Sequence, residues 1–439
     1  MDDGPRSLLT RRTLFGLGLA GAGAALLPAC SAGGSGADRQ GKLDVAFWGT
    51  QDQIAATLSA FKIFQRDHPE IAVNSQYGAY EGYFDKLATR VAGGNPPDIF
   101  QIDLPFLGDY TSRKAVRPLD EHAARLGLDK LPSSMKGLAE FGGHSYFTLV
   151  GGITQPGMAY NADLLGELGL TAQESDWTFE DFEKVATAVA TASKGKVWGT
   201  NDFGAAVVAV ESYMNGRGKA LYAQNGGLGF DETDLREWLG LWDRLRKSNV
   251  APPMDYTAAQ AGFQDYPIVK GKSAFSQIPT ARGAAALQAL TKAKITLTTF
   301  PSVSKGGVLG TTVVPVAIWA VSSRSQSVAA AVELLSFLAG SDQSAAALGI
   351  QGGVPLDEAG RKALYPKLKA GDQAIVDVFD EVSRGDLAPV QVQPSGAAQV
   401  LSAANSAIVK ANQSVGFGQA TIDQAVAEFF TQAERILSN

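Results

Sequence analysis

The feature that most restricts the fold is a regular alternation of strand and helix patterns over residues 43–102. Apolar runs typical of buried strands occur at residues 43–48, 71–73 and 98–102. Between them, residues 54–67 and 80–92 place apolar side chains at the spacing of an amphipathic helix. Strands that alternate with helices predict a doubly wound α/β sheet, which binds its ligands at the carboxyl ends of the strands.

Similar patterns continue to the end of the chain. Thr178 is expected to cap a helix, with Asp181 as its partner in a capping box. Further helices are expected at residues 231–248, 327–339 and 423–437, and strands at residues 294–300 and 313–321. A chain of 439 residues is longer than one hydrophobic core usually supports, so we expect two domains.

The first thirty residues have the order of parts of a secretory signal. Arg11 and Arg12 precede a glycine-rich apolar stretch at residues 14–27, and Cys30, the only cysteine, ends a Leu-Pro-Ala-Cys sequence. This order resembles a twin-arginine export signal with a lipoprotein cleavage site. We expect residues 1–29 to be removed, and the lipidated Cys30 with residues 31–41 to tether the protein to the outer face of the cell membrane. The alternative is a buried, unreactive cysteine behind an N-terminal helix.

The composition argues against several classes of function. The net charge is −6 without a cluster of Lys or Arg, so nucleic acid is not expected as a partner. The three histidines lack metal-ligand spacing and no phosphate-binding glycine loop is present, so we expect no metal and no cofactor. No other stretch approaches eighteen consecutive apolar residues, and no membrane-spanning helix is expected.

Four sequence blocks follow one another in the order of a known family. Residues 61–71 contain Phe and then His-Pro-Glu-Ile, and residues 93–100 contain Gly-Gly-Asn-Pro-Pro-Asp-Ile-Phe. Residues 160–178 contain Tyr-Asn-Ala-Asp-Leu, Gly-Leu and Trp-Thr, and residues 333–355 contain a late helix and a Gly-Gly-Val-Pro turn. From about residue 43 to its end, the chain resembles the family 1 extracellular solute-binding proteins of ABC importers, which include maltodextrin-type receptors.

The resemblance implies a two-lobed, periplasmic-binding-protein-like α/β fold with a ligand cleft between the lobes. Residues 42–152 and 312–345 would form the N-lobe, and residues 153–311 and 346–439 would form the C-lobe. The resemblance also implies a monomeric binding protein without enzymatic activity. Such a protein closes on a neutral sugar or oligosaccharide by a hinge movement and delivers it to ABC permease subunits.

Candidate ligand contacts come from the chemistry that sugars require. Aromatic faces suit their C–H surfaces, and planar polar side chains suit their hydroxyl groups. Three candidates have a structural alternative, since Asp52 could cap a helix, Asp103 could cap a loop and Trp177 could belong to the core. The full set, placed at strand ends and lobe crossings, is Gln51, Asp52, Gln53, Tyr80, Asp103, Trp177, Asn201, Phe203, Gln277, Thr311, Thr312, Gln351 and Gln393.

The alternatives differ in the ligand or in the chemistry. Residues 278–280 hold no aromatic side chain, whereas maltodextrin-type members carry one at this turn, which argues against long α-glucans. No Lys or Arg is among the candidates, which favours a neutral ligand over a glycerophosphodiester. An extracytoplasmic glycosidase would need two carboxylates across a cleft, and Asp52 and Asp103 are the one pair we can nominate. A sensory or scaffold protein with the same fold is a further alternative.

Overall fold

A computed structural model describes residues 41–80, 82–131, 133–172, 175–223, 225–390, 394 and 396–438. The expected export signal, Cys30 with the tether up to residue 40, and Gln393 lie outside these residues. Residues Arg39–Asn439 form one compact unit. Among the described residues, no helix is both long and apolar enough to span a membrane.

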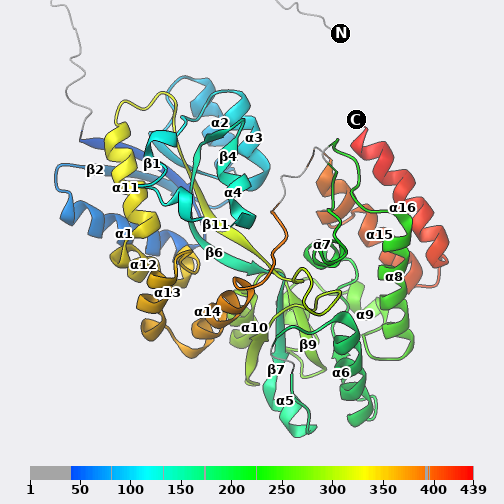
Figure 1. Ribbon diagram of the computed structural model, residues 1–439. Coiled ribbons are helices and arrows are strands. Elements are labelled where there is room, and N and C mark those ends of the chain that lie inside the picture. The colour runs from blue at the N-terminus through cyan, green and yellow to red at the C-terminus, as the bar shows by residue number, and fades with distance from the viewer. Residues whose placement is uncertain are drawn as a thin grey trace, which may run out of the picture. The chain divides into compact units, whose positions relative to one another are not determined.

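The first of two larger sheets has five strands in the order β2–β1–β3–β11–β6 (Figure 1). β1 pairs in parallel with β2 and β3, whereas β11 is antiparallel to both β3 and β6. The strands are β1 (Lys42–Trp48), β2 (Ala72–Gly78), β3 (Ile99–Ile102), β6 (Phe147–Gln155) and β11 (Thr312–Val321). The accompanying helices are α1 (Gln51–Asp67), α2 (Tyr83–Ala92), η1 (Leu104–Phe106), α3 (Leu107–Ser112), α4 (Ser133–Ala139), α11 (Val328–Gly340), α12 (Asp342–Leu348) and η5 (Gly349–Gly352).

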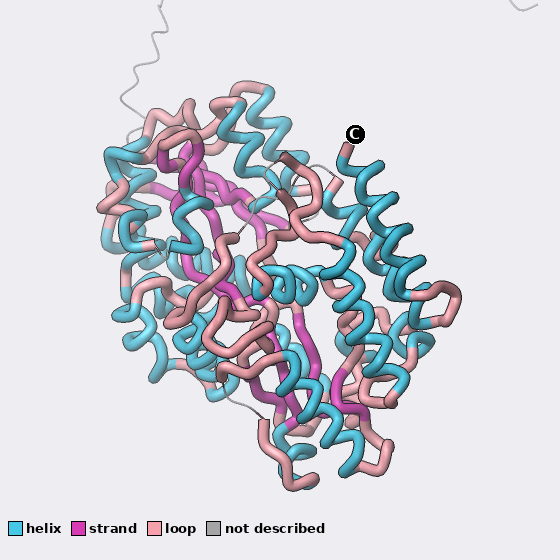
Figure 2. The backbone as a smooth tube through the Cα atoms, turned by 45° about the vertical axis from the view of Figure 1, so that its right-hand side comes forward, coloured by secondary structure: helices cyan, strands magenta, loops and turns pink. Residues whose placement is uncertain are grey.

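The second sheet has four strands in the order β10–β7–β9–β8, and Figure 2 shows both groups of strands with helices around them. β7 is antiparallel to β9 and β10, and β8 is parallel to β9. The strands are β7 (Gly157–Asn161), β8 (Trp198–Thr200), β9 (Ser273–Ile278) and β10 (Ile295–Thr298). The later helices are α5 (Ala162–Glu167), α6 (Phe179–Ala192), α7 (Val207–Gly216), α8 (Glu232–Lys247), α9 (Met254–Ala258), α10 (Gly283–Leu290), α13 (Glu358–Leu364), α14 (Ala370–Val382), α15 (Ala407–Gly416) and α16 (Ile422–Leu437).

A two-stranded ribbon connects the two sheets. It consists of residues 152–155 of β6 paired with residues 312–315 of β11. β3 ends at Ile102 opposite Ile318, so β11 continues six residues beyond β3, about 20 Å at the rise of a strand. From Gln155 the chain passes over Pro156 into β7, which begins at Gly157.

The strand directions turn the carboxyl ends of both sheets towards this ribbon. In the first sheet, β1 and β3 run parallel to β6 and end where the ribbon begins. In the second sheet, β8, β9 and β10 run antiparallel to β7 and end where β7 starts. An α/β sheet binds ligands at its carboxyl edge. The fold therefore brings two such edges to one ribbon.

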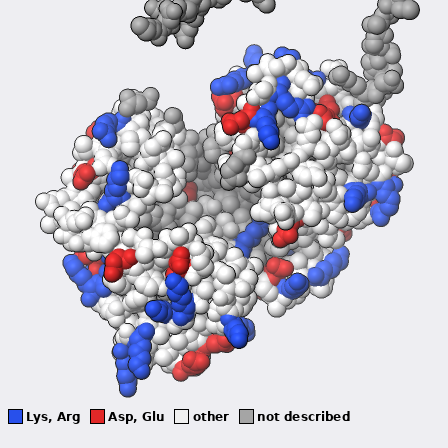
Figure 3. All heavy atoms as spheres, turned by 180° about the vertical axis from the view of Figure 1, so that it is seen from behind, with Lys and Arg blue, Asp and Glu red and all other residues white. Residues whose placement is uncertain are grey.

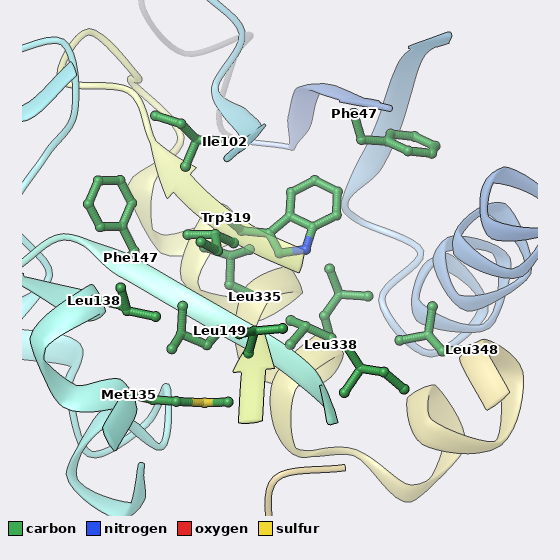
Figure 4. Close-up of a cluster of buried hydrophobic side chains, with 14 of the residues drawn as sticks. Phe47, Ile102, Met135, Leu138, Phe147, Leu149, Trp319, Leu335, Leu338 and Leu348 are labelled. Carbon is green, nitrogen blue, oxygen red and sulfur yellow. The ribbon is translucent and has the colours of Figure 1, made fainter. Parts of the chain in front are cut away.

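Two hydrophobic clusters fill the compact unit, and the first extends from the five-stranded sheet to residues of β7, β9 and β10 in the second. Figure 4 shows Trp319 of β11 pointing among side chains of the first core, and its ring centroid lies 6.0 Å from that of Phe47. The second core is rich in aromatic side chains, with Trp238, Trp242 and Phe275 fully buried. The division of the chain into two domains stays a prediction from its length.

Several expected elements are confirmed and some boundaries differ. Thr178 and Asp181 form the expected capping box at the start of α6. α1 begins at Gln51 rather than Ile54, because Thr50 caps it and forms a second capping box with Gln53. The lobe boundaries stay a prediction. Buried side chains of residues 346–382, such as Ile375 and Phe379, belong to the cluster that contains the first sheet, and α14 also packs against β10 and α10 beside the second sheet.

Candidate functional site

An aromatic cluster with an anchored carboxylate lies at the carboxyl edge of the first sheet. The hydroxyl group of Tyr80 donates a hydrogen bond to Asp103 Oδ2 at 3.0 Å. The Tyr80 ring is 41% exposed and meets the indole of Trp48 edge to face at 4.8 Å. Asp103 Oδ1 accepts from Leu104 N, which fixes the carboxylate at the start of η1. Burial and the nearby Asp103 carboxylate raise the pKa of Tyr80 to about 12, so the hydroxyl stays protonated at neutral pH.

Three amide side chains and several apolar ones line a small cavity beside this cluster. The cavity has a volume of about 30 Å³, room for about one water molecule, and its lining includes Trp48, Gln53, Gln101 and Gln351. Gln101 Oε1 accepts from Trp48 N at 3.1 Å, and Gln53 Oε1 accepts from Thr50 N at 2.9 Å. The indole N–H of Trp48 is buried and has no hydrogen-bond partner among the described residues. This edge therefore offers several hydrogen-bonding groups and few charges.

The carboxyl edge of the second sheet carries buried polar groups. Asn201 follows β8, and its Oδ1 accepts from Gln277 N on β9 at 3.0 Å. Gln277 is 4% exposed, and its Nε2 has no partner among the described residues. The same is true of the hydroxyl groups of Thr200 and Thr299. Buried polar groups are normally satisfied, so these unpartnered atoms are available for hydrogen bonds with a ligand or with water.

Three pairs of predicted residues come together in the structure. Tyr80 bonds to Asp103, Asn201 bonds to Gln277, and Gln53 lines the same cavity as Gln351. These contacts join residues far apart in the sequence, and they place the members of each pair at one of the two carboxyl edges.

Two predicted aromatic contacts are not supported by the structure. Trp177 is 1% exposed, its indole N–H donates to Thr299 O at 2.7 Å, and its ring packs in the second core. Phe203 is 3% exposed and lies 4.2 Å from the ring of Trp242. Both side chains are needed to fill the aromatic core, so neither is kept as a ligand contact.

The remaining candidates are less well placed or already engaged. Gln51 and Asp52 are exposed in the first turn of α1, and Thr50, not Asp52, is the N-cap. The Thr311 hydroxyl oxygen accepts from Phe300 N, and the Thr312 hydroxyl donates to Ala388 O. These two threonines hold chain segments together at the ribbon, and any contact with ligand stays a prediction.

The structure adds residues that the sequence analysis missed. Trp48 and Gln101 belong to the first edge, and Thr299 belongs to the second. Gln101 was the detectable signal, because it is a polar residue inside the otherwise apolar strand β3. Trp48 could have been found from its position, because it is the last residue of β1 and lies at the carboxyl end of that strand.

Glu211 is a further missed residue. It is half-buried on α7, the helix that follows the Asn201 loop, and no hydrogen bond or ion pair joins it to a described residue. Burial raises its pKa to about 7. Within the described part of the chain, no group of three or more His, Cys, Asp or Glu side chains could hold a metal ion.

The surface agrees with a weakly charged site. Figure 3 shows a face hollowed between two masses, with charged side chains mostly outside the hollow.

A family model, described as bacterial extracellular solute-binding protein, matches residues 48–345, more than half of the chain. The chain belongs to this family. Solute-binding proteins of this kind serve ABC transporters and bind small molecules rather than catalyse reactions.

Solved structures support the fold of this solute-binding protein. A family 1 extracellular solute-binding protein from Alicyclobacillus acidocaldarius is 25% identical, with a TM-score of 0.80, and the match covers 91% of this chain and 98% of the other. An oligogalacturonide-binding protein from Yersinia enterocolitica is 18% identical, with a TM-score of 0.74 and coverage of 90% and 99%. A solute-binding protein from Thermotoga lettingae, bound with α-D-tagatose, is 17% identical, with a TM-score of 0.63 and coverage of 90% and 99%.

Proposed function

We propose that this protein captures a neutral sugar or oligosaccharide between the carboxyl edges of its two sheets and delivers it to an ABC permease. The observation that carries the proposal is the pairing of an exposed aromatic face with polar groups. Tyr80 and Asp103 form one wall, and Asn201 and Gln277 form the other. Such a combination suits a ligand with C–H faces and many hydroxyl groups.

The balance of charge favours a neutral ligand over a phosphorylated one. The polar side chains at the first edge are mainly amides with one carboxylate, beside aromatic and aliphatic residues, and no Lys or Arg lines the cavity. Phosphate groups are usually bound by Arg, Lys or helix N-termini. Relatives of the same fold bind oligogalacturonide or tagatose, which supports a carbohydrate as the ligand class.

Closure of the two edges is the proposed mechanism of capture. A ligand that contacts both edges binds the closed state more tightly than the open one, and this difference in affinity is what shifts the population. The ribbon at residues 152–155 and 312–315 is the natural place for the bend, because it connects the sheets. The closed form would then be the one that the permease recognises.

The proposed location follows from the N-terminal segment. Export by the twin-arginine signal and lipidation of Cys30 would leave the protein on a tether of residues 31–41. A tethered receptor stays close to the permease at a high local concentration. Extraction of the protein with detergent, and its release by Cys30→Ala, would test the anchor independently of ligand binding.

A thermal-shift screen tests the ligand class. The chain from Ser31 onwards contains the whole compact unit Arg39–Asn439 and can be screened against neutral sugars, polyols and glycerophosphodiesters. A ligand at 100 times its dissociation constant should add about 2.7 kcal/mol to the free energy of unfolding. We expect at least one sugar to raise the melting temperature. Stabilisation by glycerophosphodiesters alone would contradict the sugar assignment, and turnover of a glycoside would contradict a binding-only role.

A further inference from the structure

The turn at residues 349–354 is fixed to the first sheet at the start of the ribbon. Gly152 N donates to Val354 O and Val354 N donates to Gly152 O, both at 2.8 Å. Gly151 has φ +63°, and a Cβ atom there would lie 2.0 Å from Gly352 O. The backbones of β6 and the turn are therefore in direct contact, with no space for a side chain between them.

The same turn is also held from the second sheet, by Arg282. This residue follows β9 and precedes α10. Its Nη2 donates to Ile350 O at 2.7 Å and to Gln351 O at 2.9 Å. These carbonyl groups come just after α12, where backbone oxygens carry partial negative charge and attract a cation.

The guanidinium of Arg282 is buried and charged, which a residue that only fills space would not need to be. Among the described residues it forms no ion pair with a carboxylate, and its Nε is buried without a partner. Burial lowers the pKa of Arg282 to about 10, so it keeps its charge at neutral pH. Burying a charge without a counter-ion is unfavourable, and an apolar side chain of similar volume would avoid that penalty.

We propose that Arg282 is a positioning residue that ties the carboxyl edge of the second sheet to the turn carrying Gln351. A movement of β9 relative to the first sheet pulls on the Gln351 carbonyl through this bond, and Gln351 lines the cavity with Gln53 and Gln101. Arg282 thus limits the range of arrangements that the two edges sample. The inference rests on the proposed function only in that Gln351 would face the ligand, and the tie itself can be tested without any ligand.

The chain offers a closely matched control in Arg117. Its Nη2 also donates to two carbonyl groups, those of Ser323 and Ser325, and its Nε is also buried without a partner among the described residues. All of these partners lie next to the first sheet, where Val116 bridges Ser322. Loss of Arg117 therefore removes a similar interaction without touching the connection between the sheets.

The test measures the distance between the two sheets in the unliganded protein. The chain from Ser31 contains no cysteine, so spin labels at Lys62→Cys on α1 and Lys196→Cys before β8, both exposed, give one defined pair. Pulsed electron paramagnetic resonance then reports the distance distribution. We expect a narrow distribution for the parent, a broader one with a shifted mean for Arg282→Met, and an intermediate one for Arg282→Lys, which keeps the charge but not the planar fork.

Arg117→Met decides whether the effect is specific. We expect it to keep the parent distribution, even if its melting temperature falls as far as that of Arg282→Met. The proposal is overturned if Arg282→Met keeps the parent distribution, or if Arg117→Met broadens it equally. If Arg282→Met does not fold, the same two criteria apply to Arg282→Lys. No sugar is present in this distance measurement, so a negative result would not affect the proposed ligand class. A negative result in the sugar screen would likewise not affect the proposed role of Arg282.

Discussion

Glu211 is the residue whose ionisation should most affect the response of this protein to pH. Its pKa in the folded protein is about 7, compared with an ordinary value of 4.5. Between these two values the folded state holds a proton that the unfolded state releases, so the free energy of unfolding falls as the pH rises. The shift corresponds to a loss of about 3 kcal/mol between pH 4.5 and 7.

Glu211→Gln should remove this loss, because the amide does not titrate. We expect the variant to be more stable than the parent at pH 8, with a much smaller difference at pH 5, in urea unfolding followed by circular dichroism. Glu434→Gln, an exposed change on α16, serves as the control and should show no such pH-dependent gain. An equal gain from Glu211→Gln at both pH values would mean that the carboxyl group is not buried as described.

At this scale the sequence could nominate residues at strand ends, whereas it could not predict which aromatic side chains are buried. Tyr80, Asp103 and Asn201 follow strands and Gln277 lies near the end of β9, and a strand end is a local property. The burial of Trp177 and Phe203 depends on which helices pack over the second sheet, and no local pattern contains that information. Glu211 was missed for the same reason, since its burial comes from tertiary neighbours.

At the scale of elements, β6 approaches the turn after α12 so closely that position 151 must be glycine. Gly151→Ala would place Cβ at 2.0 Å from Gly352 O, in a backbone conformation with φ +63°. We expect the free energy of unfolding to fall by more than about 2 kcal/mol, because both the clash and the left-handed conformation are unfavourable. Denaturant unfolding measures this directly.

Gly169→Ala provides the matched comparison. Gly169 has φ +68°, but nothing lies within 4 Å of a Cβ built there. It should lose only about 1–2 kcal/mol, the cost of the left-handed conformation. Equal losses for the two variants would show that the turn does not pack against β6 as described.

The elements themselves were largely predictable, whereas their long-range pairing was not. The alternation in residues 43–102 indicated β1, α1, β2, α2 and β3 with small boundary errors. The ribbon depends on the register of Gln155 with Thr312, which are 157 positions apart, and on the contact of Gly151 with Gly352. Such contacts are set by packing of the whole unit, so single-sequence periodicity does not reveal them.

At the scale of the whole molecule, we propose that one ligand binds between the two carboxyl edges rather than in a larger groove elsewhere on the surface. That groove has a volume of about 540 Å³ and lies beside α11, with Arg125 and Glu333 among its lining residues. Size alone would favour it, but its lining contains the Arg125–Glu333 ion pair and no unpartnered buried amide. Two variants at the carboxyl edges and one variant in the groove distinguish binding between the sheets from binding in the groove.

Calorimetric titration with the sugar found in the screen is the most direct measurement. Asp103→Asn keeps an oxygen to cap η1, and Gln277→Leu removes an amide whose Nε2 has no partner among the described residues, so both should fold. We predict that each weakens binding at least about tenfold, a loss of roughly 1.4 kcal/mol, while Glu333→Gln binds like the parent. Parent-like affinity in both edge variants, with loss of binding in Glu333→Gln, would contradict a site between the two sheets.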